Sequence, residues 1–176
     1  MNEVNDRLAF LEGELKRLND EAEIHRLLVR YCTLVDSRDA HAVATEIFAE
    51  EAVDDHGIDG RAAVGRPAIE SMFTKSNEST ESSAHFVTNS VVVLNSDTAR
   101  AQTYVTGWTW LRKSSDLGRI RPADFAITAI YDDELRRYPD GWKIVHRKLQ
   151  PLGPGAVGYG VLPPVYYGTA GVQLEI

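Results

Sequence analysis

Apolar residues recur every three or four positions over the first part of the chain, and this period is that of an α-helix. Up to about residue 20 the positions between them carry many charges, so residues 1–20 predict an amphipathic helical arm. An arm of this kind needs another surface to cover its leucines, and a partner subunit would supply one. The apolar stripe consists of Leu8, Leu11, Leu15, Leu18, Ile24, Leu27, Leu28, Tyr31 and Val35.

Two shorter helices are predicted after this stripe. Asp36, Ser37 or Asp39 interrupts the apolar pattern, and each is a side chain that caps a helix N-terminus well. We therefore expect a second helix through AHAVATEIFAEEA, residues 40–52. A third is expected in RPAIESMFTKS, where Pro67 suits the first turn because its missing N–H needs no partner there.

From about residue 84 the chain is rich in Val, Ile, Thr, Tyr and Trp, which favour half-buried strands. Turn sequences such as NSD and YPDG divide it into four strands in succession. Helices that precede a mostly antiparallel sheet predict an α+β domain with the helices on one face. The strands are HFVTNSVVVL, TARAQTYVTGWTWLRK, ADFAITAIYDDELRR and GWKIVHRKL.

A chain of 176 residues suffices for one substantial core, so we expect a single domain over residues 1–176. Residues 151–176 are dense in Gly and Pro, which disfavour a regular helix, but they contain three tyrosines. This segment is therefore expected to form a packed C-terminal cover.

Charge and composition narrow the range of partners. With 26 acidic and 19 basic residues the net charge is −7, which repels a nucleic-acid backbone. No run of about 18 apolar residues is present, so no membrane span is expected. The charged N-terminus has no signal-peptide core, and the lone Cys32 makes no internal disulfide, so we expect a cytoplasmic protein.

The first two candidates for chemistry are His85 and Asp36. His85 begins a strand on which Val87, Asn89, Val91 and Val93 share its face, while the opposite face carries Phe86, Thr88, Val92 and Leu94. Both faces are apolar, so the imidazole is either a proton-transfer group or a packed core histidine. Asp36 falls at the margin of the first helical stripe, where it is either a pocket carboxylate or a helix cap.

Two further candidates lie on apolar faces. Tyr31 stands within the helical stripe, as a core aromatic would, and its hydroxyl then needs a nearby partner. Arg147 shares a strand face with Val145 and Leu149, which fits either a pocket cation or a strand-end salt bridge.

Other polar clusters are weaker candidates. Asp54, Asp55 and His56 are adjacent in VDDHG, and neighbours on a strand point to opposite faces, so a solvated loop is expected. Cys32 has no basic activator nearby and is expected to be a buried structural thiol. The sequence contains no P-loop, dinucleotide fingerprint, GxSxG elbow or zinc signature, and we expect no metal and no cofactor.

The sequence resembles the SnoaL-like branch of the NTF2-like superfamily. The resemblance implies a cystatin-like cone, in which N-terminal helices pack on a strongly curved, mostly antiparallel sheet. Within the branch, the pattern is similar to the lindane dehydrochlorinase, scytalone dehydratase and bile acid 7α-dehydratase families. The matching segments lie between roughly residues 7 and 150 and are EIHRLLVRYCTLVDSRD, AAVGRPAIESMF, SSAHFVTNSVVV and AIYDDELRRYPDGWKIVHRKL.

The resemblance also assigns residues to a site. Those enzymes pair an aspartate on the first long helix with a histidine at the start of a core strand, and Asp36 and His85 stand at these positions. Tyr31 matches a tyrosine of the bile acid enzymes, and Arg147 matches a pocket arginine of the dehydrochlorinases. Gly107 departs from the bile acid family, which carries an acidic residue nearby.

The implied activity is that of a cofactor-independent lyase, either a dehydratase or a dehydrohalogenase. His85, made more basic by Asp36, would remove a proton from carbon, while Tyr31 assists the leaving group and Arg147 stabilises negative charge. The alternatives are an isomerase or polyketide cyclase, and a non-catalytic protein that binds small molecules. The expected pocket walls are Phe86, Val87, Tyr104, Trp108 and Phe125.

The expected partners are a small hydrophobic cyclic molecule and further copies of this chain. The helical arm and the Gly/Pro-rich tail both favour a homo-oligomer. The resemblance implies a trimer, with a dimer as the alternative.

Overall fold

The computed structural model describes residues 3–56, 61–117, 122–152 and 157–158. The first half contains helix α1 (Glu3–Asp36), helix α2 (Ala40–Ala42), a π-helical turn (Val43–Ile47), strands β1 (Phe48–Asp55) and β2 (Ala63–Val64), and helix α3 (Arg66–Ser79). The second half contains β3 (Thr80–Asn95), β4 (Thr98–Leu111), a 3₁₀ turn (Arg112–Leu117), β5 (Phe125–Tyr138), β6 (Gly141–Pro151) and β7 (Val157–Gly158).

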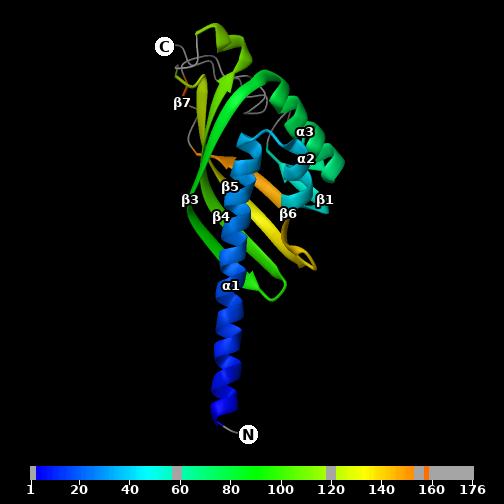
Figure 1. The fold of residues 1–176 in the computed structure, drawn as a ribbon, viewed down its shortest axis with the longest axis vertical. Helices are drawn as coiled ribbons and strands as arrows, with labels where there is room; N and C mark the ends of the chain where they lie inside the picture. The colour runs from blue at the N-terminus through cyan, green and yellow to red at the C-terminus, as the bar shows by residue number, and fades with distance from the viewer. Residues whose placement is uncertain (1–2, 57–60, 118–121, 153–156, 159–176) are drawn as a thin grey trace.

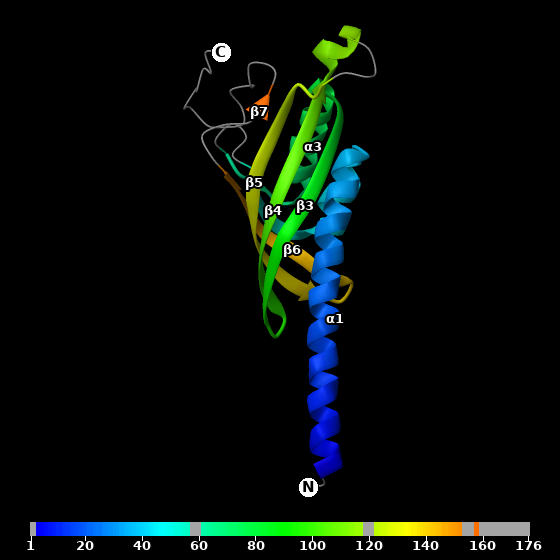
Figure 2. The same ribbon diagram turned by 90° about the vertical axis from the view of Figure 1, so that its left-hand side faces the viewer.

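The strands form one twisted sheet in the order β2-β1-β6-β5-β4-β3, and β7 pairs with β5. Strands β1 and β6 run parallel, whereas the other pairs are antiparallel. The helices lie over one face of this sheet (Figures 1 and 2). The predicted α+β architecture is therefore confirmed, and the four predicted strands correspond to β3, β4, β5 and β6.

The second predicted helix is wrong beyond Ile47. Asp39 caps α2 by accepting a hydrogen bond from the backbone amide of Ala42 at 2.9 Å, but the chain leaves the helix after the π-helical turn. Residues 48–52 instead enter β1, which pairs with β6. Phe48 and Ala52 are buried in the core in this conformation, so sheet pairing and burial override the local helical pattern.

Helix α1 is one continuous element, and only its C-terminal half belongs to the core. Ile24, Leu28, Tyr31 and Leu34 are buried against the sheet. The N-terminal half projects well past the end of the sheet, beyond the β3–β4 turn (Figure 1). The predicted arm is therefore helical from Glu3 onward and carries exposed apolar side chains.

A bulge in β3 changes which residues face the core. The pairing with β4 shifts between Thr88 and Val91, where Asn89 has a φ of +43°. Val92 and Leu94 consequently pack toward the core, whereas Val91 and Val93 are exposed on the outer face. Simple alternation instead places Val91 and Val93 on the same face as His85, because it counts no extra residue.

Most of the predicted C-terminal cover lies outside the described residues. Of residues 151–176, the structure describes Pro151, Leu152 and the short strand β7, which pairs with the start of β5. Among the helices in the described ranges, none is both long and apolar enough to cross a membrane.

Candidate active site

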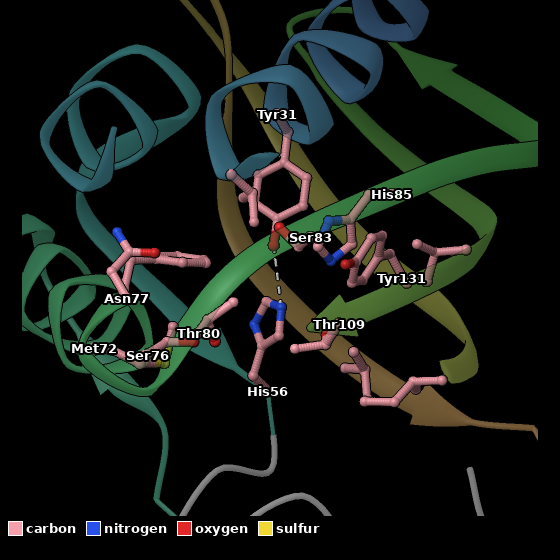
Figure 3. A pocket seen from close by; sticks show the side chains of 16 residues that line it. Tyr31, His56, Met72, Ser76, Asn77, Thr80, Ser83, His85, Thr109 and Tyr131 are labelled. Carbon is pink, nitrogen blue, oxygen red and sulfur yellow. Dashed lines mark hydrogen bonds between the residues drawn. The ribbon is translucent and has the colours of Figure 1, made fainter. Parts of the chain in front are cut away.

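A pocket lies between helices α1 and α3 and the inner face of the sheet (Figure 3). Its walls are largely apolar, with a few hydroxyl, amide and imidazole groups pointing inward. The lining residues are Tyr31, Val35, His56, Met72, Phe73, Ser76, Asn77, Thr80, Ser83, His85, Val105, Gly107, Thr109, Ile127, Tyr131 and Leu149.

One wall of the pocket carries a histidine–carboxylate pair. Asp36 is the last residue of α1, and its Oδ1 lies 2.6 Å from Nδ1 of His85 on β3. The same carboxylate accepts hydrogen bonds from the backbone amide of His85 and from the hydroxyl of Ser83, both at 2.9 Å. Three donors therefore converge on Asp36, which is a partner of His85 and not the cap of α2.

These contacts determine the charge of Asp36 and the form of His85. Burial alone would raise the pKa of Asp36, but hydrogen bonds from the His85 ring and amide outweigh it and hold this pKa below its ordinary value. An ionised Asp36 accepts a proton-bearing Nδ1, so the neutral ring of His85 keeps its lone pair on Nε2. His85 lines the pocket, and its Nε2 is the atom available as a base.

Arg38 holds the end of α1 against the start of β3. It adopts a φ of +66° just past the helix and donates to the carbonyl oxygens of Asn77, Thr80 and Glu81, the last at 2.9 Å. The Asn77 side chain donates back to the carbonyl oxygen of Arg38 at 3.1 Å. This cross-connection fixes the position of Asp36 relative to His85.

The absence of a side chain at Gly107 leaves room for the imidazole ring of His85. Gly107 stands opposite His85 in the β3–β4 pairing, and a Cβ atom at this position would lie 3.0 Å from both Cδ2 and Nε2 of the ring. A contact this close requires the ring or the strand to move. The glycine that departs from the bile acid family is therefore the residue against which the His85 ring lies.

A second imidazole lies in the same pocket. Nε2 of His56 is 3.1 Å from the hydroxyl of Tyr31 (Figure 3). Nδ1 of His56 is 2.5 Å from the carboxylate of Asp54. Asp54 is fully buried in β1, and its other carboxylate oxygen has no hydrogen-bond partner among the described residues. Burial raises the pKa of Tyr31 well above its usual range, so the phenol keeps its proton.

The prediction of a solvated loop at Asp54 and His56 is therefore wrong. Asp54 and His56 are separated by one residue, so their side chains lie on the same side of an extended chain. Both side chains point into the protein, where they contact each other. The sequence did not reveal this because the start of β1 reads as helix. A strand assignment there would have placed Asp54 and His56 on one face.

Arg147 is in the core beneath the pocket. Its side chain is 0% exposed, and Nε and Nη2 each donate to one oxygen of Asp133 at 2.7 Å. The guanidinium lies 4.2 Å from the ring centre of Tyr31 and 4.0 Å from that of Tyr131. Burial opposes the charge on Arg147, but Asp133 outweighs it and raises this pKa well above its ordinary value. Arg147 therefore forms a salt bridge, but in the middle of β6 and not at a strand end as expected, and it does not line the pocket.

The five expected wall residues are not among those that line the pocket. Phe86, Tyr104 and Trp108 point to the outer face of the sheet, because the inward positions of β3 and β4 are occupied by His85, Val105, Gly107 and Thr109. Val87 lines a separate groove beside α1, and Phe125 is buried at the start of β5.

No group of three or more His, Cys, Asp or Glu side chains is arranged to hold a metal ion within the described ranges. Cys32 is buried in α1, and burial raises the pKa of its thiol to about 11.

The family model of the SnoaL-like domain matches residues 16–148 of the chain. This span includes Tyr31, Asp36, His56, His85 and Arg147. The chain belongs to the SnoaL-like domain family. Its sequence matches none of the curated proteins. The solved structures that resemble it include three with TM-scores between 0.66 and 0.70.

One is an NTF2-like protein with a cystatin-like fold from Novosphingobium aromaticivorans, with 26% identity, a TM-score of 0.66, and coverage of 84% of this chain and 92% of that chain. The second is a putative scytalone dehydratase from the same organism, with 17% identity, a TM-score of 0.70, and coverage of 89% and 97%. The third is a hexachlorocyclohexane dehydrochlorinase (LinA) type 2, with 19% identity, a TM-score of 0.69, and coverage of 86% and 97%. These likenesses establish the NTF2-like fold.

Proposed function

We propose that this SnoaL-like protein is a cofactor-independent dehydratase that acts on a small hydrophobic cyclic substrate. The observation that carries the proposal is the presence of two imidazoles with carboxylate partners in one pocket, His85 with Asp36 and His56 with Asp54. One imidazole is arranged as a base. The other is hydrogen-bonded to a protonated phenol and is arranged to supply a proton.

The base is Nε2 of His85. It would remove a proton from a carbon of the substrate, and the Nδ1–H bond to Asp36 would stabilise the imidazolium that forms. An imidazole is too weak a base for an ordinary C–H bond, so the carbon is expected to lie beside a carbonyl group. The C–H electron pair then forms the new C=C bond.

The acid is the hydroxyl of Tyr31, which would protonate the departing hydroxyl group so that it leaves as water. His56 would act in its doubly protonated form: its Nε2–H would replace the proton that Tyr31 gives up, its Nδ1–H would stay directed at Asp54, and the ring would become neutral. The substrate thus loses one proton to His85 and gains one on its leaving oxygen. Exchange with solvent would restore both imidazoles.

The position of Arg147 outside the pocket lining favours a dehydratase over a dehydrohalogenase. A halide leaves as an anion and is best stabilised by a cation, whereas a hydroxyl group needs a proton donor. Among the described residues that line the pocket none is a lysine or an arginine, and Arg147 is covered by the rings of Tyr31 and Tyr131. Proton donors are what this pocket offers to a leaving group.

The test is to incubate the protein with cyclic alcohols that carry a carbonyl group next to the reacting C–H, and to measure loss of water by mass spectrometry. We expect turnover by the parent and a loss of about 10²–10⁴-fold in His85→Gln. The matched control is His41→Gln, which alters an exposed histidine outside the pocket. Substrate that binds without being converted would instead support a binding protein.

A further inference from the structure

The projecting half of α1 carries a continuous apolar stripe that no described residue covers. The stripe consists of Val4, Leu8, Leu11, Leu15 and Leu18, whose successive spacings alternate between four and three residues. Each of these side chains is between 53% and 68% exposed. Apolar residues with this alternation repeat every seven residues, and this is the pattern of a coiled-coil seam.

The same seam continues along the half of α1 that packs on the sheet, through Ala22, His25 and Val29. At 100° per residue the centre of these positions lies about a third of a turn around the helix from the centre of Ile24 and Leu28, which face the protein's own core. The seam is therefore set to one side of the core-facing stripe, and at its C-terminal end His25 and Val29 border the groove beside α1 that Val87 also lines.

We propose that two copies of this chain associate through their α1 helices as a parallel two-stranded coiled coil. The occupant of the seam is thus the seam of a second copy. This pairing is independent of the proposed dehydratase activity.

The charged residues beside the seam favour the parallel orientation. In a parallel pair, Arg7 of one copy lies beside Glu12 of the other, and Glu21 lies beside Arg26, so both pairs attract. Neither Arg7 nor Glu12 has an ion-pair partner elsewhere in the described ranges. An antiparallel pair centred on the arm would instead bring Glu12 and Glu14 against the same residues of the other copy.

The charge of the arm also argues against a membrane surface as the partner. Residues 3–21 contain six acidic side chains and three basic ones, and anionic lipid repels such a helix. Charged positions on both sides of the seam keep it narrow, which suits two strands better than three.

The first test compares two neighbouring substitutions in the full chain by sedimentation equilibrium. We expect the parent to be a dimer and Leu11→Glu to weaken dimerisation by about 100-fold or more, because a charge enters the seam of both helices. The matched control is Phe10→Glu, since Phe10 is also exposed but lies about a third of a turn from the seam. An oligomer that survives Leu11→Glu, or a monomeric parent, would overturn the proposal.

The second test reports the orientation. In a parallel pair the two copies of Val4 are neighbours, so Val4→Cys should form a disulfide-linked dimer on mild oxidation. Cys32 does not interfere because it is buried in α1. In an antiparallel pair residue 4 would lie far from its counterpart, and a failure to cross-link would reject the parallel arrangement.

Discussion

Nδ1 of His85 and the Asp36 carboxylate lie 2.6 Å apart although the two residues are 49 positions apart in the chain. The contact joins the last residue of α1 to the strand that follows α3. Since the same carboxylate also accepts the backbone amide of His85, the ring is fixed together with the strand that carries it. This arrangement keeps one nitrogen of the ring protonated and leaves the other as a base.

Replacing Asp36 with Asn should lower activity by about 10²-fold or more while the protein stays folded. Three hydrogen-bond donors converge on the two carboxylate oxygens of Asp36. An amide has only one oxygen, so the NH₂ group of the asparagine must face at least one of these donors, and two donors then meet without an acceptor. The ring relieves this conflict by moving its proton to Nε2, which removes the base. Steady-state kinetics and the nitrogen chemical shifts of His85 would measure both effects. An active variant with an unchanged tautomer would contradict this role.

Asp36 should also make the stability of the fold depend on pH. Its pKa is lower in the folded protein than the ordinary value of 3.8, so its contribution is fully present above 3.8 and is lost as the pH falls through the lower folded value. The difference in the free energy of unfolding between the parent and Asp36→Asn should therefore shrink below this pH. Urea denaturation at about pH 6 and about pH 3 would measure it. A difference in the free energy of unfolding that grew on acidification would contradict a lowered pKa of Asp36 in the folded protein.

Gly107→Ala should reduce activity more than stability. The added methyl group would lie 3.0 Å from Nε2 of His85, so the ring must shift by a few tenths of an ångström or more. A displacement of this size weakens proton transfer by about 10-fold or more, because the reaction depends on geometry. Kinetics and thermal denaturation on the same preparations would separate the effects. Full activity in this variant would mean that the ring tolerates the shift.

Tyr31→Phe and His56→Gln should impair the leaving-group side of the reaction. Both variants interrupt the proton route from His56 through Tyr31 to the departing oxygen, and each should lower the elimination rate by about 10²-fold. Proton removal by His85 should persist in both. Comparing elimination with hydrogen exchange at the substrate carbon would reveal this split, and an equal loss of the two activities would argue against an acid role.

Breaking the buried ion pair should destabilise the fold. Arg147→Met leaves the Asp133 carboxylate without its partner in a fully buried position, and the free energy of unfolding should fall by about 3–5 kcal/mol. The double variant Arg147→Met with Asp133→Leu should recover much of this loss, because no charge remains buried. Urea unfolding would measure both variants. A double variant as unstable as the single one would show that stacking on Tyr31 and Tyr131 matters more than the charge.

The sequence predicted those parts of the fold and site that depend on strong local patterns. The long helix, the third helix and four strands follow from apolar periodicity, and the resemblance placed Asp36 and His85 together, where the structure also has them in contact. It missed β1 because residues 48–52 become a strand only by pairing with β6, a contact that local propensity does not encode. His56 was missed for the same reason.

Two other errors have equally physical causes. The bulge at Asn89 reverses the alternation beyond it, and a single positive φ is invisible in the apolar pattern. Arg147 matched a pocket arginine by position, but its role depends on Asp133, which lies opposite it on the neighbouring strand. A match to a motif position does not reveal whether the guanidinium group faces the pocket or is covered by the rings of Tyr31 and Tyr131.

The most direct test of the central claim is hydrogen exchange on a cyclic ketone that lacks a leaving group. In deuterated water, the parent protein should exchange the hydrogen beside the carbonyl group, since His85 removes it without any elimination. His85→Gln should lose this exchange, whereas Tyr31→Phe should retain it. Exchange at the same rate in the parent and in His85→Gln would contradict the assignment of His85 as the base.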